Sequence, residues 1–217
     1  MRILLAGATG VIGRQAVPDV IVHMLTAIPD PIDPRYLARD MALTNRLRTE
    51  GTANLVAAAG GNARIIAHGL AYADDPAGSL VKDEGAPLWR DPPGQFGPVL
   101  AALRDMEHQV AAAGGLVLRL GHLYGPGSSY APQGGFTRQL RAGKVPIVGD
   151  GGSMFSFHAY DAATALLAAV DHPAAGGVLP PTAPGGTVWP PSAASPRGER
   201  GGPGRPPHPR SGTSTCR

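Results

Sequence analysis

The sequence predicts an α/β fold built on a parallel β-sheet. Short, continuous apolar runs, such as MRILLA at residues 1–6 and LVLRL at residues 116–120, are typical of parallel strands that are buried on both faces. These runs alternate with segments of helical length, and such alternation indicates crossover connections within one parallel sheet. The 217 residues suffice for one domain of moderate size with its own core.

The predicted elements follow one another along the chain. After the first strand, a glycine loop leads into a short helix at 11–17 that Pro18 ends, and VIVHML at 20–25 is the second strand. A long helix is predicted at 36–59, because the paired glycines that follow it form a C-terminal stop. The remaining predicted strands are 64–67, 116–120 and 145–149, and the remaining predicted helices are 99–113, 136–142 and 161–170.

The composition changes abruptly at Pro180. Residues 180–217 contain ten Pro, seven Gly and five Arg, with hardly any apolar periodicity. The net positive charge of the chain comes from this segment, because the remaining residues are close to neutral in sum. This segment cannot bury enough apolar surface to fold, so we expect a domain at 1–179 and a disordered tail at 180–217. A shifted reading frame in GC-rich DNA and a genuine linker both explain such a tail.

Several classes of function are disfavoured. The only cysteine, Cys216, allows neither an internal disulfide nor a thiolate zinc site, and the seven histidines lack metal-ligand spacing, so no metal is expected. The N-terminus does not read as a signal peptide and no apolar stretch is long enough to span a membrane, so a cytoplasmic protein without a membrane partner is expected. Lys82 and Lys144 are the only lysines, so no specific nucleic-acid partner is expected.

The glycine loop predicts a dinucleotide site. Gly7, Gly10 and Gly13 have the spacing G-x-x-G-x-x-G directly after a strand and at the start of a helix. The glycines allow a tight turn, close approach of the backbone to a pyrophosphate, and close packing of helix on strand. The N–H groups at the start of the helix then face the phosphates.

Five blocks in order resemble the extended and atypical short-chain dehydrogenase/reductases, the NAD-dependent epimerase/dehydratase family. GATGVIG matches the glycine loop of the family, VIVHMLTA is similar to its fourth strand V-V-x-H-x-A-A, and TEGTANLVAAA is similar to N-V-x-G-T-x-N-L-L-x-A. RLGHLYGPG is similar to R-P-x-x-V-Y-G-P-G, and VGDGGSMFSFHAYDAATALLAAV is similar to the later G-x-G-x…H-V-x-D-x-A-x-A segment. The resemblance covers residues 1–170.

The resemblance implies a Rossmann-like, doubly wound parallel sheet, an NAD or NADP cofactor and a small or sugar-nucleotide substrate. The cofactor-binding residues that it implies are Gly7, Thr9, Gly10, Val11, Ile12, Gly13, Leu25, Thr26, Ala27, His68 and His122. The oligomeric state stays open.

The nucleotide-binding half is shortened. Only six residues separate Gly13 from Val20, so the second and third strands of the family are missing, and with them the residue that selects NAD or NADP. Residues 7–19 are just enough for a parallel crossover. We interpret Asp30 and Asp33, about 20 residues after the loop, as turn residues. The substrate-binding part is also incomplete, because the tail replaces the sequence expected there.

The Tyr-x-x-x-Lys pair of the family is absent. Val99 and Leu103 stand at the Tyr and Lys positions, and the Ser/Thr position falls at His68 or Gly69. His68 or Tyr72 could supply an acid instead, or be a loop histidine and a packed tyrosine. His122 either lines the nicotinamide pocket or caps local structure.

In the later block, His158 and Asp161 match the H-V-x-D of the family, and we expect Asp161 to cap the following helix. Three alternatives stay open for the function of the whole chain. They are an NAD(P)-dependent epimerase/dehydratase-like oxidoreductase, a non-catalytic dinucleotide-binding or sensing protein, and an inactive truncated product.

Overall fold

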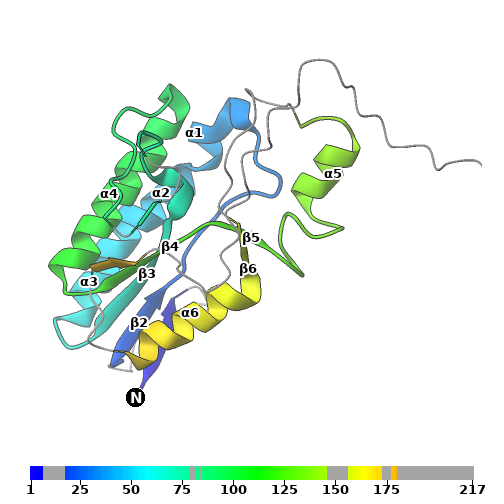
Figure 1. The fold of residues 1–217 in the computed structure, drawn as a ribbon. Helices are drawn as coiled ribbons and strands as arrows, with labels where there is room; N and C mark the ends of the chain where they lie inside the picture. Colours follow the sequence, from blue (N-terminus) through cyan, green and yellow to red (C-terminus); the bar gives the residue numbers. More distant parts are fainter. Residues whose placement is uncertain (7–17, 79–81, 84, 146–155, 173–176, 180–217) are drawn as a thin grey trace, which may run out of the picture.

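The computed structural model describes residues 1–6, 18–78, 82–83, 85–145, 156–172 and 177–179. Its main sheet has five strands, and every neighbouring pair is parallel (Figure 1). In spatial order, the strands are β1 (Ile3–Ala6), β2 (Val20–His23), β3 (Arg64–Leu70), β4 (Leu116–Leu120) and β7 (Gly177–Leu179). The predicted parallel α/β fold is confirmed.

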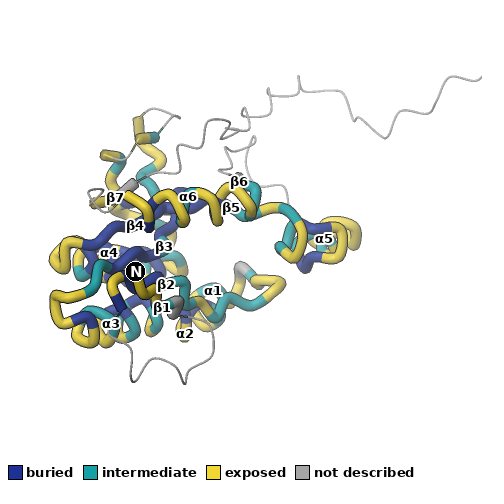
Figure 2. Tube along the Cα trace, turned by 90° about the horizontal axis from the view of Figure 1, so that it is seen from below, coloured by how far each residue is buried: buried dark blue, intermediate teal, exposed yellow. Residues whose placement is uncertain are grey.

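Helices cover both faces of this sheet, as a doubly wound fold requires. Because side chains alternate along a strand, Ile21, Ile65 and Val117 face one side, where α3 (Thr52–Ala59) and α4 (Gly97–Ala112) pack. Side chains of the opposite parity pack against α6 (Ala159–Asp171), and these are Val20, Val22, Ile66, Leu116, Leu118 and Leu120. Figure 2 shows β2 and β3 between α6 and α3. Continuous apolar strands are the consequence of this two-sided burial.

The crossover from β1 to β2 is as short as the sequence predicts. The two strands are parallel neighbours with Ile3 opposite Val20, although only residues 7–19 connect them. Asp19 fixes the start of β2, since its N–H donates to the Arg2 carbonyl and its carboxylate accepts from the Arg2 N–H. The described residues place no strand beyond β1, and Ile3 is 49% exposed. The shortened half therefore leaves β1 at the edge of the described sheet.

The helix predicted at 36–59 is a series of shorter pieces. Its N-terminal pieces are a 3₁₀ turn η2 (Pro34–Tyr36), α1 (Leu37–Asp40) and α2 (Ala42–Arg46), followed by a π-helical turn η3 (Leu47–Gly51) and then α3. Asp33 caps the first turn by accepting from the Arg35 N–H, as its interpretation as a turn residue implied. Gly60, with φ of 54°, ends α3 and confirms the predicted stop.

Three short strands were missed by the sequence analysis. β5 (His122–Tyr124) and β6 (Ser156–His158) pair in parallel as a second sheet, and β7 joins the main sheet next to β4. Three residues each are too few for a hydrophobic period to be read. α5 (Gly135–Arg141) lies near its predicted place, beyond the main sheet in Figure 1. Most of the predicted strand at 145–149 and all of the tail at 180–217 lie outside the described residues.

The predicted capping role of Asp161 was wrong, and Asp30 makes contacts beyond its predicted role as a turn residue. The N-cap of α6 is His158, whose Nδ1 accepts from the Tyr160 N–H, and Asp161 lies within the first turn instead. Asp30 is more than a turn residue, because its carboxylate accepts from the Ser129 hydroxyl at 2.6 Å and from the Gly135 N–H at 3.1 Å. Asp30 therefore ties the loop after β2 to the start of α5.

Candidate functional site

The candidate site lies where the parallel strands end. The carboxyl ends of β1, β2, β3 and β4 meet at one edge of the sheet, where ligands bind in open α/β folds. At this edge, His23 closes β2 and lies opposite Ala6, the last residue of β1. Gly7, Thr9, Gly10, Val11, Ile12 and Gly13 lie outside the described residues, so the predicted phosphate loop stays a prediction.

The segment after β2 holds the other predicted cofactor contacts. The Leu25 N–H donates to Nδ1 of His23 at 3.4 Å, and the Ala27 N–H donates to the hydroxyl of buried Thr44 at 3.0 Å. Thr26, between them, is exposed. These bonds fix an extended segment over the carboxyl end of β2, next to the edge where β1 ends.

His23 is a buried neutral histidine. Its Nε2 lies 3.1 Å from the Thr52 hydroxyl, and burial lowers the pKa of its imidazole. Because Nδ1 accepts from the backbone, Nε2 carries the proton and donates to Thr52. Arg48, from η3, lies close enough to lower the pKa of His23 further.

His68 is held on β3 as a neutral side chain. Burial, and then the nearby charge of Arg48, lower its pKa from 6.5 to about 4. It is therefore deprotonated at neutral pH and has no imidazolium proton to give. Gly69, which follows it, has no room for a side chain, because a Cβ there would lie 2.9 Å from Val117 Cγ1.

Tyr72 and His122 stack face to face. Their ring centroids are 4.3 Å apart with 8° between the planes, and the Tyr130 hydroxyl lies 2.9 Å from Nδ1 of His122. Burial raises the pKa of Tyr72 to about 12, although the charge of Arg48 acts to lower it. Burial also lowers the pKa of His122. Tyr72 therefore keeps its proton at neutral pH and connects Arg48 to the pair of His122 and Tyr130.

Ring contacts and electrostatic proximity to Arg48 relate six side chains, which we call the polar cluster: His23, Arg48, His68, Tyr72, His122 and Tyr130. His68, Tyr72 and His122 were predicted from the sequence, whereas His23, Arg48 and Tyr130 were not. The signal for Arg48 is visible in the sequence, because with Gly51-Thr52 aligned to the G-T of the family pattern, Arg48 stands where that pattern has Asn.

The positions of the family Tyr and Lys are part of the core. Val99 is 1% exposed and Leu103 is fully buried, both on the face of α4 that packs on the sheet. Apolar side chains at these positions cannot transfer protons. Among the described residues at this edge, the polar cluster supplies the candidate acids.

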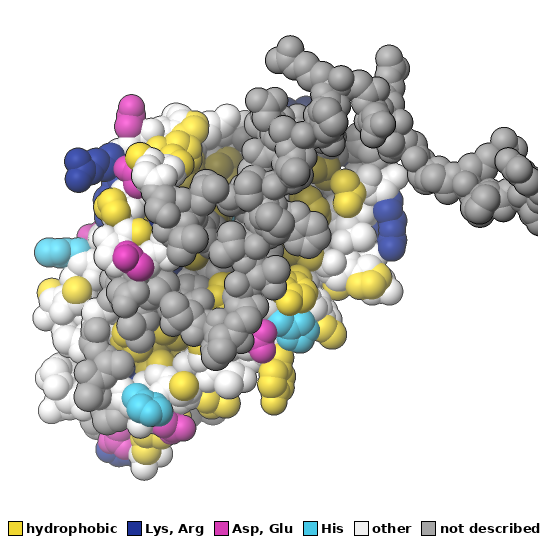
Figure 3. All heavy atoms as spheres, viewed as in Figure 1, with side chains coloured by type: hydrophobic (Ala, Val, Ile, Leu, Met, Phe, Trp, Pro, Cys, Tyr) yellow, Lys and Arg dark blue, Asp and Glu magenta, His cyan; other side chains and the backbone are white. Residues whose placement is uncertain are grey.

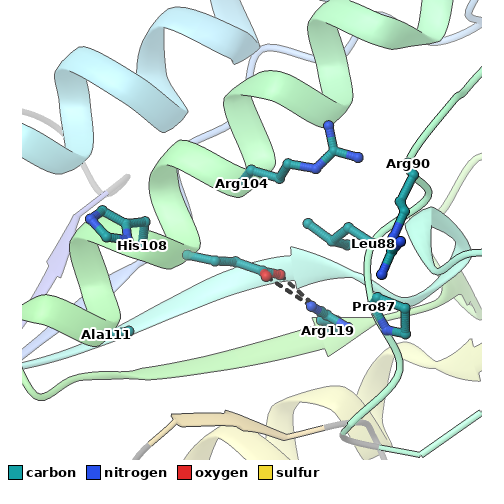
Figure 4. Close-up of a pocket in the computed structure, with 8 residues that line it drawn as sticks. Pro87, Leu88, Arg90, Arg104, His108, Ala111 and Arg119 are labelled. Atoms are coloured by element: carbon teal, nitrogen blue, oxygen red, sulfur yellow. Dashed lines mark hydrogen bonds and ion pairs between the residues drawn. The ribbon is translucent and has the colours of Figure 1, made fainter.

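A second group of charges lies on the other side of β4. Arg119 makes two bonds of 2.9 and 2.8 Å to the Glu107 carboxylate, and it also pairs with Asp74 at 2.9 Å. Figure 4 shows the bonds between Arg119 and the α4 carboxylate. Both residues line a pocket of about 610 Å³, together with Arg90 and Arg104. Because Arg119 is fully paired, we interpret this group as structural.

Other kinds of site find little support in the described part of the chain. It contains no group of three or more side chains that could hold a metal ion. None of the helices among its residues is long and apolar enough to cross a membrane. On the face in Figure 3, the basic side chains that are visible lie at separate points.

A known relative shares most of the chain. The sequence is 38% identical to a 3-diazoavenalumate denitrifying reductase of a Streptomyces species, over 81% of this chain and 74% of that protein. That alignment extends over 231 residues, more than the 217 of this chain, so the relative contains inserted segments that this chain lacks. No profile of a known protein family matches the chain.

Solved structures share the fold. Pal from Bacillus thuringiensis is 21% identical with a TM-score of 0.58, and covers 75% of this chain and 54% of its own. WbmG of Bordetella bronchiseptica in complex with NAD is 21% identical with a TM-score of 0.53, over 76% of this chain and 50% of its own. MoeE5 in complex with UDP-glucuronic acid and NAD is 21% identical with a TM-score of 0.57, over 75% of this chain and 56% of its own. The chain thus spans about half the length of these structures.

Proposed function

Because the chain belongs to the extended short-chain dehydrogenase/reductases of the NAD-dependent epimerase/dehydratase type, we propose that it is an NAD(P)-dependent reductase of a small organic molecule. The observation that carries this proposal is the polar cluster at the carboxyl ends of the strands, which contains buried donors without a partner among the described residues. These donors are Nη1 and Nη2 of Arg48. Unpaired buried donors and acceptors fit a site that a polar ligand completes.

The cofactor fits this edge of the sheet. The glycine loop, with Gly7, Gly10 and Gly13, directly follows β1, and the segment of Leu25, Thr26 and Ala27 follows the neighbouring strand. We assign the pyrophosphate to the first and the nicotinamide end to the second, with His68 and His122 beside it. When bound, a reduced nicotinamide supplies a hydride.

Tyr72 is the candidate proton donor of the site. Hydride addition to a neutral acceptor leaves a negative charge that a proton must neutralise. His68, with a pKa of about 4, holds no such proton at neutral pH, whereas Tyr72 keeps its phenolic proton. Stacking on His122 fixes the ring, and Arg48 stabilises the phenolate left after transfer.

We choose the substrate class from the Streptomyces reductase, which is 38% identical to this chain. The name of the Streptomyces protein identifies a diazo-bearing carboxylate as the molecule it reduces, so such a compound is the first substrate to test. A sugar nucleotide has weaker support, because the structure with UDP-glucuronic acid is only 21% identical. A non-catalytic dinucleotide-binding protein remains the second candidate, which the missing Tyr-x-x-x-Lys pair favours.

Thermal melting with reduced cofactors tests the proposal. We expect a cooperative transition that rises with millimolar NADPH or NADH, since ligand at 100 times its Kd stabilises a protein by about 2.7 kcal/mol. Tyr72→Phe should keep this shift and lose most of the cofactor oxidation that a diazo carboxylate elicits. A cofactor shift without oxidation by the wild type would establish the non-catalytic alternative, and no shift with either cofactor would refute both.

A further inference from the structure

Among the described residues, Arg48 is a buried cation without a compensating charge. It is 2% exposed, and neither Nη1 nor Nη2 has a hydrogen-bond partner in the described part of the chain. The described groups closest to it electrostatically are His23, His68 and Tyr72, which are neutral at neutral pH. An unpaired buried charge costs several kcal/mol, and proteins normally compensate it with a carboxylate.

Arg119 shows how this chain satisfies a buried arginine. Its guanidinium bonds Glu107, Asp74 and the Ala86 carbonyl. Arg48 is equally buried but has no such partners. The contrast indicates that the partner of Arg48 comes from outside the described structure.

The backbone aims Arg48 inward. It lies in the π-helical turn η3, and such turns occur frequently at functional sites because they reorient one side chain of a helix. Its neighbours Arg46 and Glu50 pair with each other at 2.8 Å on the surface, with side chains that are 67% and 61% exposed. Only Arg48 of these three enters the polar cluster.

We propose that Arg48 binds an oxyanion group of the ligand, a carboxylate or a phosphate, through two parallel bonds from Nη1 and Nη2. A guanidinium and an oxyanion fit each other in this paired geometry, and the bonds are strong where water is excluded. The neutral histidines and Tyr72 leave the positive charge available to that anion. The inference rests on the proposed function, because it places a ligand at the carboxyl edge of the sheet.

Two sources offer this chemistry. A substrate carboxylate would lie beside Tyr72, whereas a cofactor phosphate would reach Arg48 from the end of β1, where the pyrophosphate is assigned. The thermal unfolding of the full chain is therefore measured with benzoate and with NADPH. Benzamide serves as the uncharged analogue of benzoate. The variants are Arg48→Met, Arg48→Lys and, as a surface control in the same helix, Arg46→Met.

If Arg48 binds a substrate carboxylate, benzoate stabilises both the wild type and Arg46→Met, whereas benzamide stabilises neither. Arg48→Met then binds benzoate at least tenfold more weakly than the wild type, and its affinity for NADPH is unchanged. If it binds a cofactor phosphate, Arg48→Met loses tenfold or more in NADPH affinity. Arg48→Lys keeps the charge without the paired geometry, so it should lie between wild type and Arg48→Met. If Arg48→Met does not fold, the affinities of Arg48→Lys for benzoate and NADPH are compared with those of the wild type instead.

Equal affinity of the wild type and the Arg48 variants for both benzoate and NADPH would overturn the inference, as would a wild type that neither anion stabilises. The two proposals fail differently. NADPH binding that is unaffected by Arg48→Met, together with no benzoate binding, refutes the role of Arg48 and leaves the proposed function intact.

Discussion

His68 should make the protein less stable in mild acid. In the unfolded chain its imidazole takes a proton near pH 6.5, whereas burial beside Arg48 and His23 keeps the folded ring neutral down to about pH 4. Between these values the unfolded state binds more protons, so the free energy of unfolding falls as the pH falls. The contribution of His68 is complete above pH 6.5 and is lost toward pH 4.

The pKa values set the magnitude. The difference between a pKa of 6.5 and a pKa of about 4 corresponds to about 3 kcal/mol in the free energy of unfolding. About 2 kcal/mol of this stability is already lost at pH 5. Asp74 acts in the opposite sense, because burial raises its pKa to about 6 and favours the folded state as that carboxyl takes a proton. Burial also lowers the pKa of His23 and His122, which act in the same sense as His68, so the wild type alone would show only the net of all these effects.

A comparison with His68→Gln isolates the histidine, since Asp74 is common to both proteins. Urea unfolding at pH 7 and pH 5 should show that the wild type loses about 2 kcal/mol more than the variant over this interval. NMR titration of the His68 ring provides a direct second measurement. An equal loss in both proteins, or a ring that titrates near 6.5, would refute the reasoning.

Two further predictions concern packing and charge. Gly115→Ala should destabilise the fold by about 1–3 kcal/mol in thermal melts, because the new Cβ would lie 2.5 Å from the Ile65 carbonyl oxygen. Its control Gly94→Ala, in the exposed 3₁₀ turn η5 (Gly94–Phe96) with no non-neighbouring atom within 4 Å, should be neutral or stabilise by up to about 1 kcal/mol, and an equal loss in both would contradict the steric argument. Glu107→Gln should cost about 3 kcal/mol in urea unfolding, because buried Arg119 keeps only Asp74 as a charged partner; a change below 1 kcal/mol would show that this ion pair contributes little.

The parallel sheet could be predicted because its signal is local. The runs at 20–25 and 116–120 are apolar except for His23 and Arg119, and such nearly continuous apolar runs are typical of strands with both faces covered. The end of α3 at Gly60 was equally readable, since a left-handed residue after a helix favours glycine. Substitution of the family Tyr and Lys by Val99 and Leu103 was visible too, and burial of both explains why they are apolar.

The sequence by itself thus determined the parallel sheet, its longer strands and the loss of the usual catalytic pair. The tertiary structure decided which polar side chains meet, because that depends on contacts between segments far apart in the chain. Asp30 reaches Ser129 and Gly135, and Tyr72 stacks on His122. The π-helical turn that buries Arg48 could not be predicted, since the sequence at 36–59 reads as one regular helix. Packing therefore made the candidate site.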